Sequence, residues 1–300
     1  MKGVILVENS FVHPYMPNSV PENKKAMLDE LGINSVEDIY KSIIPDELLY
    51  KERLDIPEPI RSEYELKRHV MGILNRDITT EEYTSFLGAG CYKHQVPAIC
   101  DEINSRGEFL TAYCGDTYSD HGKMQAIFEY TSMMGELLDT DVVSYTTYDG
   151  GQAVASSLRM AVRAVREKGM AGKVILVPKT MNPEIYSQVV QYCRNVAEVR
   201  KIAYEPETGL MDLEELKEQL AKKNVAAVFF ENPTYLGNFE TRGEEIAKLA
   251  HDAGAYCVVQ TEVAALGIME SPVNQGADIV CGDIQPLGMH IQFGGGQAGF

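Results

Sequence analysis

Apolar positions along this chain change their spacing near residue 120, and the change predicts two kinds of structure. Before that point, apolar residues recur at helical spacing in short stretches at residues 24–31, 36–43 and 62–74, with prolines between them. Helices as short as these bury little apolar surface by themselves. We therefore expect residues 1–80 to form a helical N-terminal arm that wraps another surface.

After residue 120, long helical stretches alternate with short, continuous apolar runs. The predicted buried strands are residues 142–146, 174–177, 225–230, 255–260 and 278–281. The predicted helices are residues 122–138, 153–165, 183–192, 213–222 and 244–253. This alternation is typical of a mostly parallel sheet that helices cover on both faces. We expect residues 81–300 to form one α/β domain.

Composition and charge narrow the class of protein. The 27 basic and 44 acidic residues give a net charge of −17, which disfavours nucleic acid or a membrane surface as a partner. The apolar runs are far shorter than the roughly 20 residues of a membrane span. The six cysteines, at positions 91, 100, 114, 193, 257 and 281, form no Cys-x-x-Cys pair. They predict reduced thiols and a cytoplasmic protein.

Two glycine patterns do not carry the chemistry that they suggest. Residues 294–299 satisfy G-x-G-x-x-G, but no βαβ unit follows them. Residues 115–123 have six residues between the glycines, where a phosphate-binding loop has four, and Met124 stands where Ser or Thr would hold magnesium. No paired spacing of histidines and cysteines predicts a metal site.

The turn at residues 148–152 has two interpretations. Its glycines leave backbone N–H groups at the positive end of a helix, which suits a phosphate ester. Alternatively, it is a plain strand-to-helix turn. The candidate residues are Asp149, Gly150, Gly151 and Gln152.

Several segments together resemble one family. They are residues 13–19 (HPYMPNS), 86–97 (FLGAGCYKHQVP), 109–113 (FLTAY), 122–130 (GKMQAIFEY), 148–150 (YDG), 282–288 (GDIQPLG) and 293–295 (FGG). On these motifs the chain resembles subunit 1 (alpha) of the two-subunit glycine decarboxylase, the P-protein of the glycine cleavage system. The resemblance implies the aspartate-aminotransferase fold (fold type I) of pyridoxal-phosphate (PLP) dependent transferases. It also implies a smaller C-terminal domain, which we expect this chain to lack.

The resemblance implies that the enzyme's chemistry is shared between subunits. A homologous β subunit would carry the PLP lysine in an α2β2 assembly, and the aminomethyl group of glycine would pass to the lipoyl carrier H-protein. A PLP site needs a lysine and an acid beside the pyridine nitrogen. Here the acid candidate is Glu262, and motif alignment places the lysine position near Leu287.

A leucine cannot bind PLP covalently, and the last lysine in the chain is Lys248. We therefore expect no covalent PLP on this chain, whose role would be to complete the active site of the β subunit. The residues expected to line that site are Tyr92, His94, Tyr113 and Cys114.

Departures from the family pattern leave the substrate open. Residues 114–121 read CGDTYSDH, where the family favours a segment with two prolines. One alternative is a subunit of a PLP enzyme that acts on another amino acid. A second is a non-catalytic paralogue that stabilises or regulates a partner. The retained segments at residues 86–97 and 149–152 favour a catalytic role.

Overall fold

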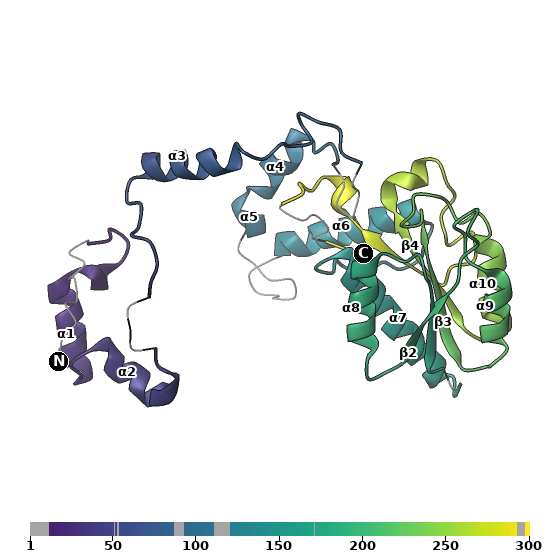
Figure 1. The fold of residues 1–300 in the computed structure, drawn as a ribbon, viewed down its shortest axis with the longest axis horizontal. Helices are drawn as coiled ribbons and strands as arrows, with labels where there is room; N and C mark the ends of the chain where they lie inside the picture. Colours follow the sequence, from purple (N-terminus) through teal and green to yellow (C-terminus); the bar gives the residue numbers. More distant parts are fainter. Residues whose placement is uncertain are drawn as a thin grey trace. The chain divides into compact units, whose positions relative to one another are not determined.

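The computed structural model of this chain describes residues 12–50, 52, 54–86, 93–110, 121–170, 172–292 and 298–300 (Figure 1). The α-helices within these ranges are α1 (Pro21–Leu31), α2 (Val36–Ile43), α3 (Glu63–Leu74), α4 (Ala98–Asn104), α5 (Gly107–Leu110), α6 (His121–Leu138), α7 (Gly150–Glu167), α8 (Pro183–Cys193), α9 (Leu213–Leu220) and α10 (Gly243–Asp252). The strands are β1 (Val174–Pro178), β2 (Glu198–Ile202), β3 (Val225–Asn232), β4 (Tyr256–Glu262) and β5 (Ile279–Asp283). Short 3-10 helices are η1 (Pro17–Ser19), η2 (Asp46–Leu48), η3 (Val263–Gly267) and η4 (Gln285–Leu287).

The chain divides into two compact units, residues 1–77 and 78–300. The first unit carries α1, α2 and α3, whose ends follow local signals. Gly32, with φ of +68°, ends α1 in the left-handed conformation, and Ser35 forms a capping box with Asp38 at the start of α2. None of the described residues before Met134 is buried. Within its described residues, the first unit therefore has no hydrophobic core.

The second unit is built on a parallel sheet with the strand order β2-β1-β3-β4-β5. Helices α7 and α8 cover one face, and α9 and α10 cover the other (Figure 1). The α7–α8 side buries Leu158 and Phe229, and the α9–α10 side buries Leu216 and Val228. The predicted fold class is confirmed.

The two ends of the sheet differ from the sequence-based expectation. Strand β2 was not predicted, because its sequence EVRKI is mostly charged and it pairs along one side only. The strand predicted at residues 142–146 is wrong, since these residues join no strand of the sheet and the next residue, Thr147, forms a single antiparallel bridge with Gly299. Val142 is 84% exposed, so this segment lacks the packed surface that would hold a strand.

Cysteines within the described ranges are free thiols, as predicted. Cys193, Cys257 and Cys281 are buried in the sheet layers, and Cys100 is half-buried. Burial raises the pKa of Cys257 and of Cys281 to about 12, so these thiols stay neutral. Cys91 and Cys114 lie outside the described residues.

Candidate functional site

The carboxyl ends of β3, β4 and β5 meet at one edge of the sheet, beside the first turn of α7. In open α/β sheets this edge is where ligands bind. The strand register places Glu262 beside Asp283 and Glu231 beside Gln260. Residues two positions earlier on these strands, such as Phe229 and Cys281, belong to the α7–α8 side of the core. Because side chains alternate along a strand, the four polar side chains lie on that same face.

The first turn of α7 is closed by its own side chains. The Oδ1 atom of Asp149 accepts the Gln152 N–H at 2.6 Å, and the Gln152 Oε1 atom accepts the Tyr148 N–H at 2.8 Å. A Cβ at Gly150 would lie 3.2 Å from the Asp283 Cβ, so this glycine allows α7 to approach β5 closely. This geometry suits a strand-to-helix turn with an N-capping carboxylate. A phosphate site here stays a prediction.

At this edge, His94 affects the pKa values of the Glu262 and Asp283 carboxyl groups, and Asp149 affects that of Asp283. Burial raises the pKa of Glu262, and the negative charge of Asp283 adds to the increase, while the Ala264 N–H and His94 oppose it. Burial also raises the pKa of Asp283, with a further increase from Asp149 and opposition from the Gln285 N–H and His94. The site is therefore acidic, with His94 as the neighbouring base.

Glu231, at the end of β3, is a fourth carboxyl group on this face and is only 5% exposed. It accepts the Asn182 N–H at 3.1 Å and the Tyr235 N–H at 3.3 Å. Burial raises its pKa to about 7, against the lowering effect of these two hydrogen bonds. The carboxyl group thus joins the loop after β1 to the loop after β3.

The segment after β5 carries the position predicted for a lysine. Leu287 lies in η4 and is 50% exposed. A Cβ at Gly288 would lie 2.7 Å from the Cys100 Sγ atom, and His290 Nε2 lies 2.9 Å from Asp101 Oδ1. This segment therefore contacts α4, which directly follows the motif at residues 86–97.

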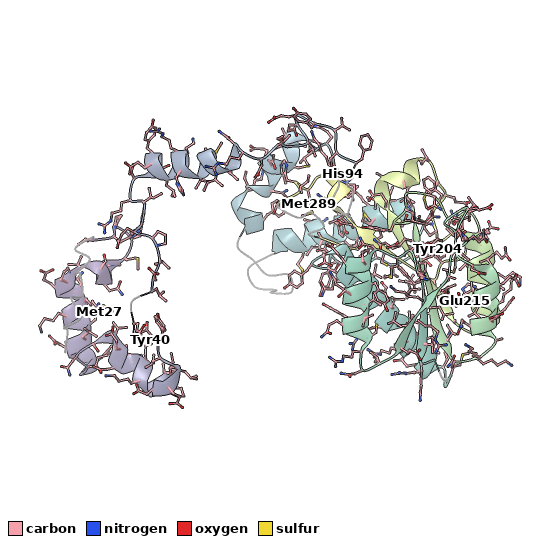
Figure 2. The ribbon with its side chains drawn as sticks, in the orientation of Figure 1. Met27, Tyr40, His94, Tyr204, Glu215 and Met289 are labelled. Carbon is pink, nitrogen blue, oxygen red and sulfur yellow. The ribbon has the colours of Figure 1, made fainter. Side chains whose placement is uncertain are left out.

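The structure brings together only part of the predicted site. His94, labelled in Figure 2, is coupled electrostatically to Glu262, and Asp149 to Asp283. The predicted residues Tyr92, Tyr113 and Cys114 lie outside the described residues. Sequence reasoning missed Asp283 and Glu231, although each lies at the end of an apolar strand as Glu262 does.

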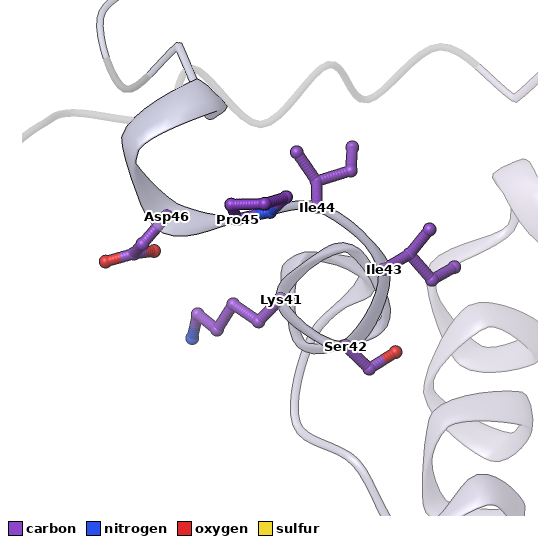
Figure 3. Close-up of a pocket in the computed structure, with 6 residues that line it drawn as sticks. All are labelled: Lys41, Ser42, Ile43, Ile44, Pro45 and Asp46. Carbon is purple, nitrogen blue, oxygen red and sulfur yellow. The ribbon is translucent and has the colours of Figure 1, made fainter.

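A hollow of about 510 Å³ lies elsewhere, in the first unit (Figure 3). Its lining is one continuous segment, Lys41, Ser42, Ile43, Ile44, Pro45 and Asp46. Since a binding site normally gathers polar groups from several elements, this turn is not the candidate site. Within the described ranges, no three His, Cys, Asp or Glu side chains gather as metal ligands would. No described helix has the length and apolar character needed to cross a membrane.

Comparisons with known proteins identify the family. The family model described as Glycine cleavage system P-protein matches residues 13–300. A "Probable glycine dehydrogenase (decarboxylating) subunit 1" from Staphylothermus marinus is 35% identical over 294 residues, which cover 94% of this chain and 60% of that protein. A protein of the same name from Pyrococcus horikoshii is 38% identical over 287 residues, which cover 95% of this chain and 62% of that protein. The chain thus spans about 60% of the length of the curated relatives that it matches.

Solved structures agree with the sequence comparisons. The inhibitor-bound crystal structure of glycine decarboxylase (P-protein) of the glycine cleavage system superposes with a TM-score of 0.78 and 31% identity, over 96% of this chain and 62% of that one. A sphingosine-1-phosphate lyase from Burkholderia pseudomallei gives a TM-score of 0.56 at 13% identity, over 86% of this chain and 62% of that one, and shows the fold alone. The sheet is that of fold type I PLP-dependent enzymes, and the chain belongs to the glycine cleavage system P-protein family.

Proposed function

We propose that this chain acts as the α subunit of a two-subunit glycine decarboxylase, whose β subunit carries the lysine and PLP. The observation that carries the proposal is an acidic site at the carboxyl edge of a fold type I sheet, with Leu287 at the position expected for the lysine. The relatives are named "subunit 1", which supports a second subunit as partner.

The residues at this edge do not fit PLP on this chain. No lysine follows Lys248 in the sequence, so the segment around Leu287 offers no amine for an imine. The carboxylate of Asp149 takes an N–H group of the α7 first turn, which a phosphate would otherwise receive. Asp149, Glu262 and Asp283 add negative charge beside that turn, and like charges repel a phosphate dianion.

In this proposal the chain contributes surface and polar groups to the partner's active site. The predicted wall consists of Tyr92, His94, Tyr113 and Cys114, with His94 as the group that could move a proton. His94 interacts electrostatically with Glu262 and with Asp283, and it opposes the increase that burial causes in the pKa of each carboxyl group. The lipoyl carrier H-protein and an α2β2 stoichiometry are part of the same proposal.

The test is co-purification with a homologous lysine-bearing β subunit, followed by an absorbance spectrum and glycine-dependent exchange of carbon dioxide, with and without lipoate. We expect the pair to be yellow and to exchange carbon dioxide, and the chain alone to be colourless. A yellow pair that is inert with glycine but active with another amino acid would mean that this amino acid, and not glycine, is the substrate. A colourless, inactive pair would favour a stabilising or regulatory paralogue. A yellow isolated chain would refute the absence of PLP binding.

A further inference from the structure

Glu231 is a buried carboxyl group for which the described part of the chain offers no cationic partner. Among the described residues, no ion pair reaches it, and its hydrogen bonds come from the backbone N–H groups of Asn182 and Tyr235. The ionisable side chains nearest to its end of the surrounding elements include Asp149, Lys179, Glu184, Tyr186, Tyr235 and Glu262. None of these side chains is hydrogen-bonded to the Glu231 carboxyl group. An ionised carboxylate at this position would be costly.

A buried hydrogen-bond acceptor without a donor lies on the adjacent strand. The Oε1 atom of Gln260 is inaccessible to solvent and has no hydrogen-bond partner among the residues that the structure describes. Gln260 is the register partner of Glu231, and both side chains extend from the same face of the sheet. A buried acceptor that is left unsatisfied destabilises the fold, because it has lost its water without gaining a partner. The missing group is one hydrogen-bond donor, and a protonated carboxyl group supplies one.

We propose that Glu231 is a positioning residue that stays protonated in the folded chain, accepts the Asn182 and Tyr235 N–H groups, and donates its hydroxyl hydrogen to Gln260 Oε1. One carboxyl group then satisfies three polar groups on three elements. The raised pKa, about 7, agrees with a group that is largely protonated in mildly acidic solution and loses its proton as the pH rises through 7.

The consequence is a fixed geometry for two loops at the candidate site. Asn182 caps the start of α8, since its Oδ1 atom accepts the Glu184 N–H at 2.9 Å. Tyr235 lies in a tight turn in which the Thr234 N–H donates to the Asn238 carbonyl at 2.8 Å. Glu231 ties this turn to the start of α8, at the same edge as Glu262. That these loops position groups for glycine chemistry rests on the proposed function, whereas the proton on Glu231 does not.

The competing arrangement is an ionised Glu231 that accepts an N–H from a reversed Gln260 amide, since the two ends of an amide are assigned from its contacts. Infrared difference spectroscopy separates the two, because only a protonated carboxyl group gives the carbonyl stretch of a carboxylic acid. The sample is the whole chain near pH 6, with Glu231→Gln, Gln260→Met and Glu240→Gln as variants. Glu240 is the matched control, because it is 3% exposed but forms an ion pair with Arg242.

We expect the wild-type chain to show an acid carbonyl band, Glu231→Gln to lose the part of it that belongs to Glu231, and Glu240→Gln to keep the whole band. In Gln260→Met the band should remain and shift, because the hydroxyl group loses its acceptor. A wild-type chain without the band would overturn the proposal, as would a band that is undiminished in Glu231→Gln. A band that Gln260→Met leaves unmoved would refute the bond to Gln260.

Two further readouts test the positioning role. Glutamine offers one acceptor oxygen, so Glu231→Gln should speed hydrogen exchange at one of the two amides, Asn182 or Tyr235, by up to about tenfold. With a β subunit bound, the variant should raise the KM for glycine by up to about tenfold with kcat nearly unchanged. If hydrogen exchange at the Asn182 and Tyr235 amides stayed unchanged in Glu231→Gln, the proposal that Glu231 holds these two loops together would be refuted. If the wild-type complex is inactive, the proposed function fails, while the infrared and exchange results still decide the state of Glu231.

Discussion

Replacing Glu231 with glutamine should change how the stability of this chain depends on pH. The pKa of this carboxyl group rises from 4.5 to about 7 on folding, because the group is buried. Between these values the folded state holds a proton that the unfolded state has released, so stability decreases as the pH rises. The loss begins near pH 4.5 and is complete above about pH 7. One pKa unit corresponds to about 1.4 kcal/mol, so the ionisation of Glu231 should lower the unfolding free energy by about 2.5 kcal/mol between pH 5 and pH 8.

The assay is urea unfolding of the wild-type chain and of Glu231→Gln at pH 5, 6, 7 and 8. The variant has no proton to lose, so the difference in unfolding free energy between the two proteins should change by about 2.5 kcal/mol across this range. As the pH rises, the variant should become more stable relative to the wild-type chain. The glutamine also leaves one amide N–H without an acceptor, which costs about 1–3 kcal/mol. Because this cost is the same at every pH, it does not affect the change in the difference between pH 5 and pH 8.

Glu240→Gln serves as the control, because Glu240 is similarly buried but is paired with Arg242 at 3.1 Å. It should not reproduce the pH-dependent gain. The reasoning would be refuted if the difference in unfolding free energy between the wild-type chain and Glu231→Gln stayed constant from pH 5 to pH 8. That result would mean that burial does not raise the pKa of Glu231.

Three more predictions test the carboxyl edge. Asp149→Ala should lower the unfolding free energy by about 1 kcal/mol, measured by urea unfolding, because the Gln152 N–H loses its cap, and Asp149→Asn should recover most of it. Gly282→Ala should lower the midpoint of thermal unfolding, because its Cβ would lie 2.2 Å from the Thr261 carbonyl oxygen; a midpoint equal to wild type would contradict this packing. Leu287→Lys should leave the isolated chain colourless with PLP, because the acidic edge stays unsuited to phosphate, and a visible band lost on borohydride reduction would contradict that.

The sequence alone determined most of the helices and the central strands. Short-range signals decide these elements, and they are written in neighbouring residues: the left-handed Gly32 that ends α1, and the apolar run that becomes β3. Asp212 caps α9, because its side chain accepts the N–H groups of Glu214 and Glu215. The Glu215 carboxylate (Figure 2) accepts the Ala203 N–H at 2.7 Å, because folding brings the end of β2 beside the helix.

Only the tertiary structure decided the edges of the sheet and the composition of the site. The charged strand β2 forms because β1 offers it hydrogen-bonding partners, which no local pattern reveals. Likewise, the parallel register decides that Glu262 lies beside Asp283 and Glu231 beside Gln260. Each residue ends or nearly ends a strand in the sequence, but burial and the neighbouring strand determine its charge and its partner. Local sequence therefore predicts which segments fold, while long-range pairing determines which polar groups meet and which of them keep a proton.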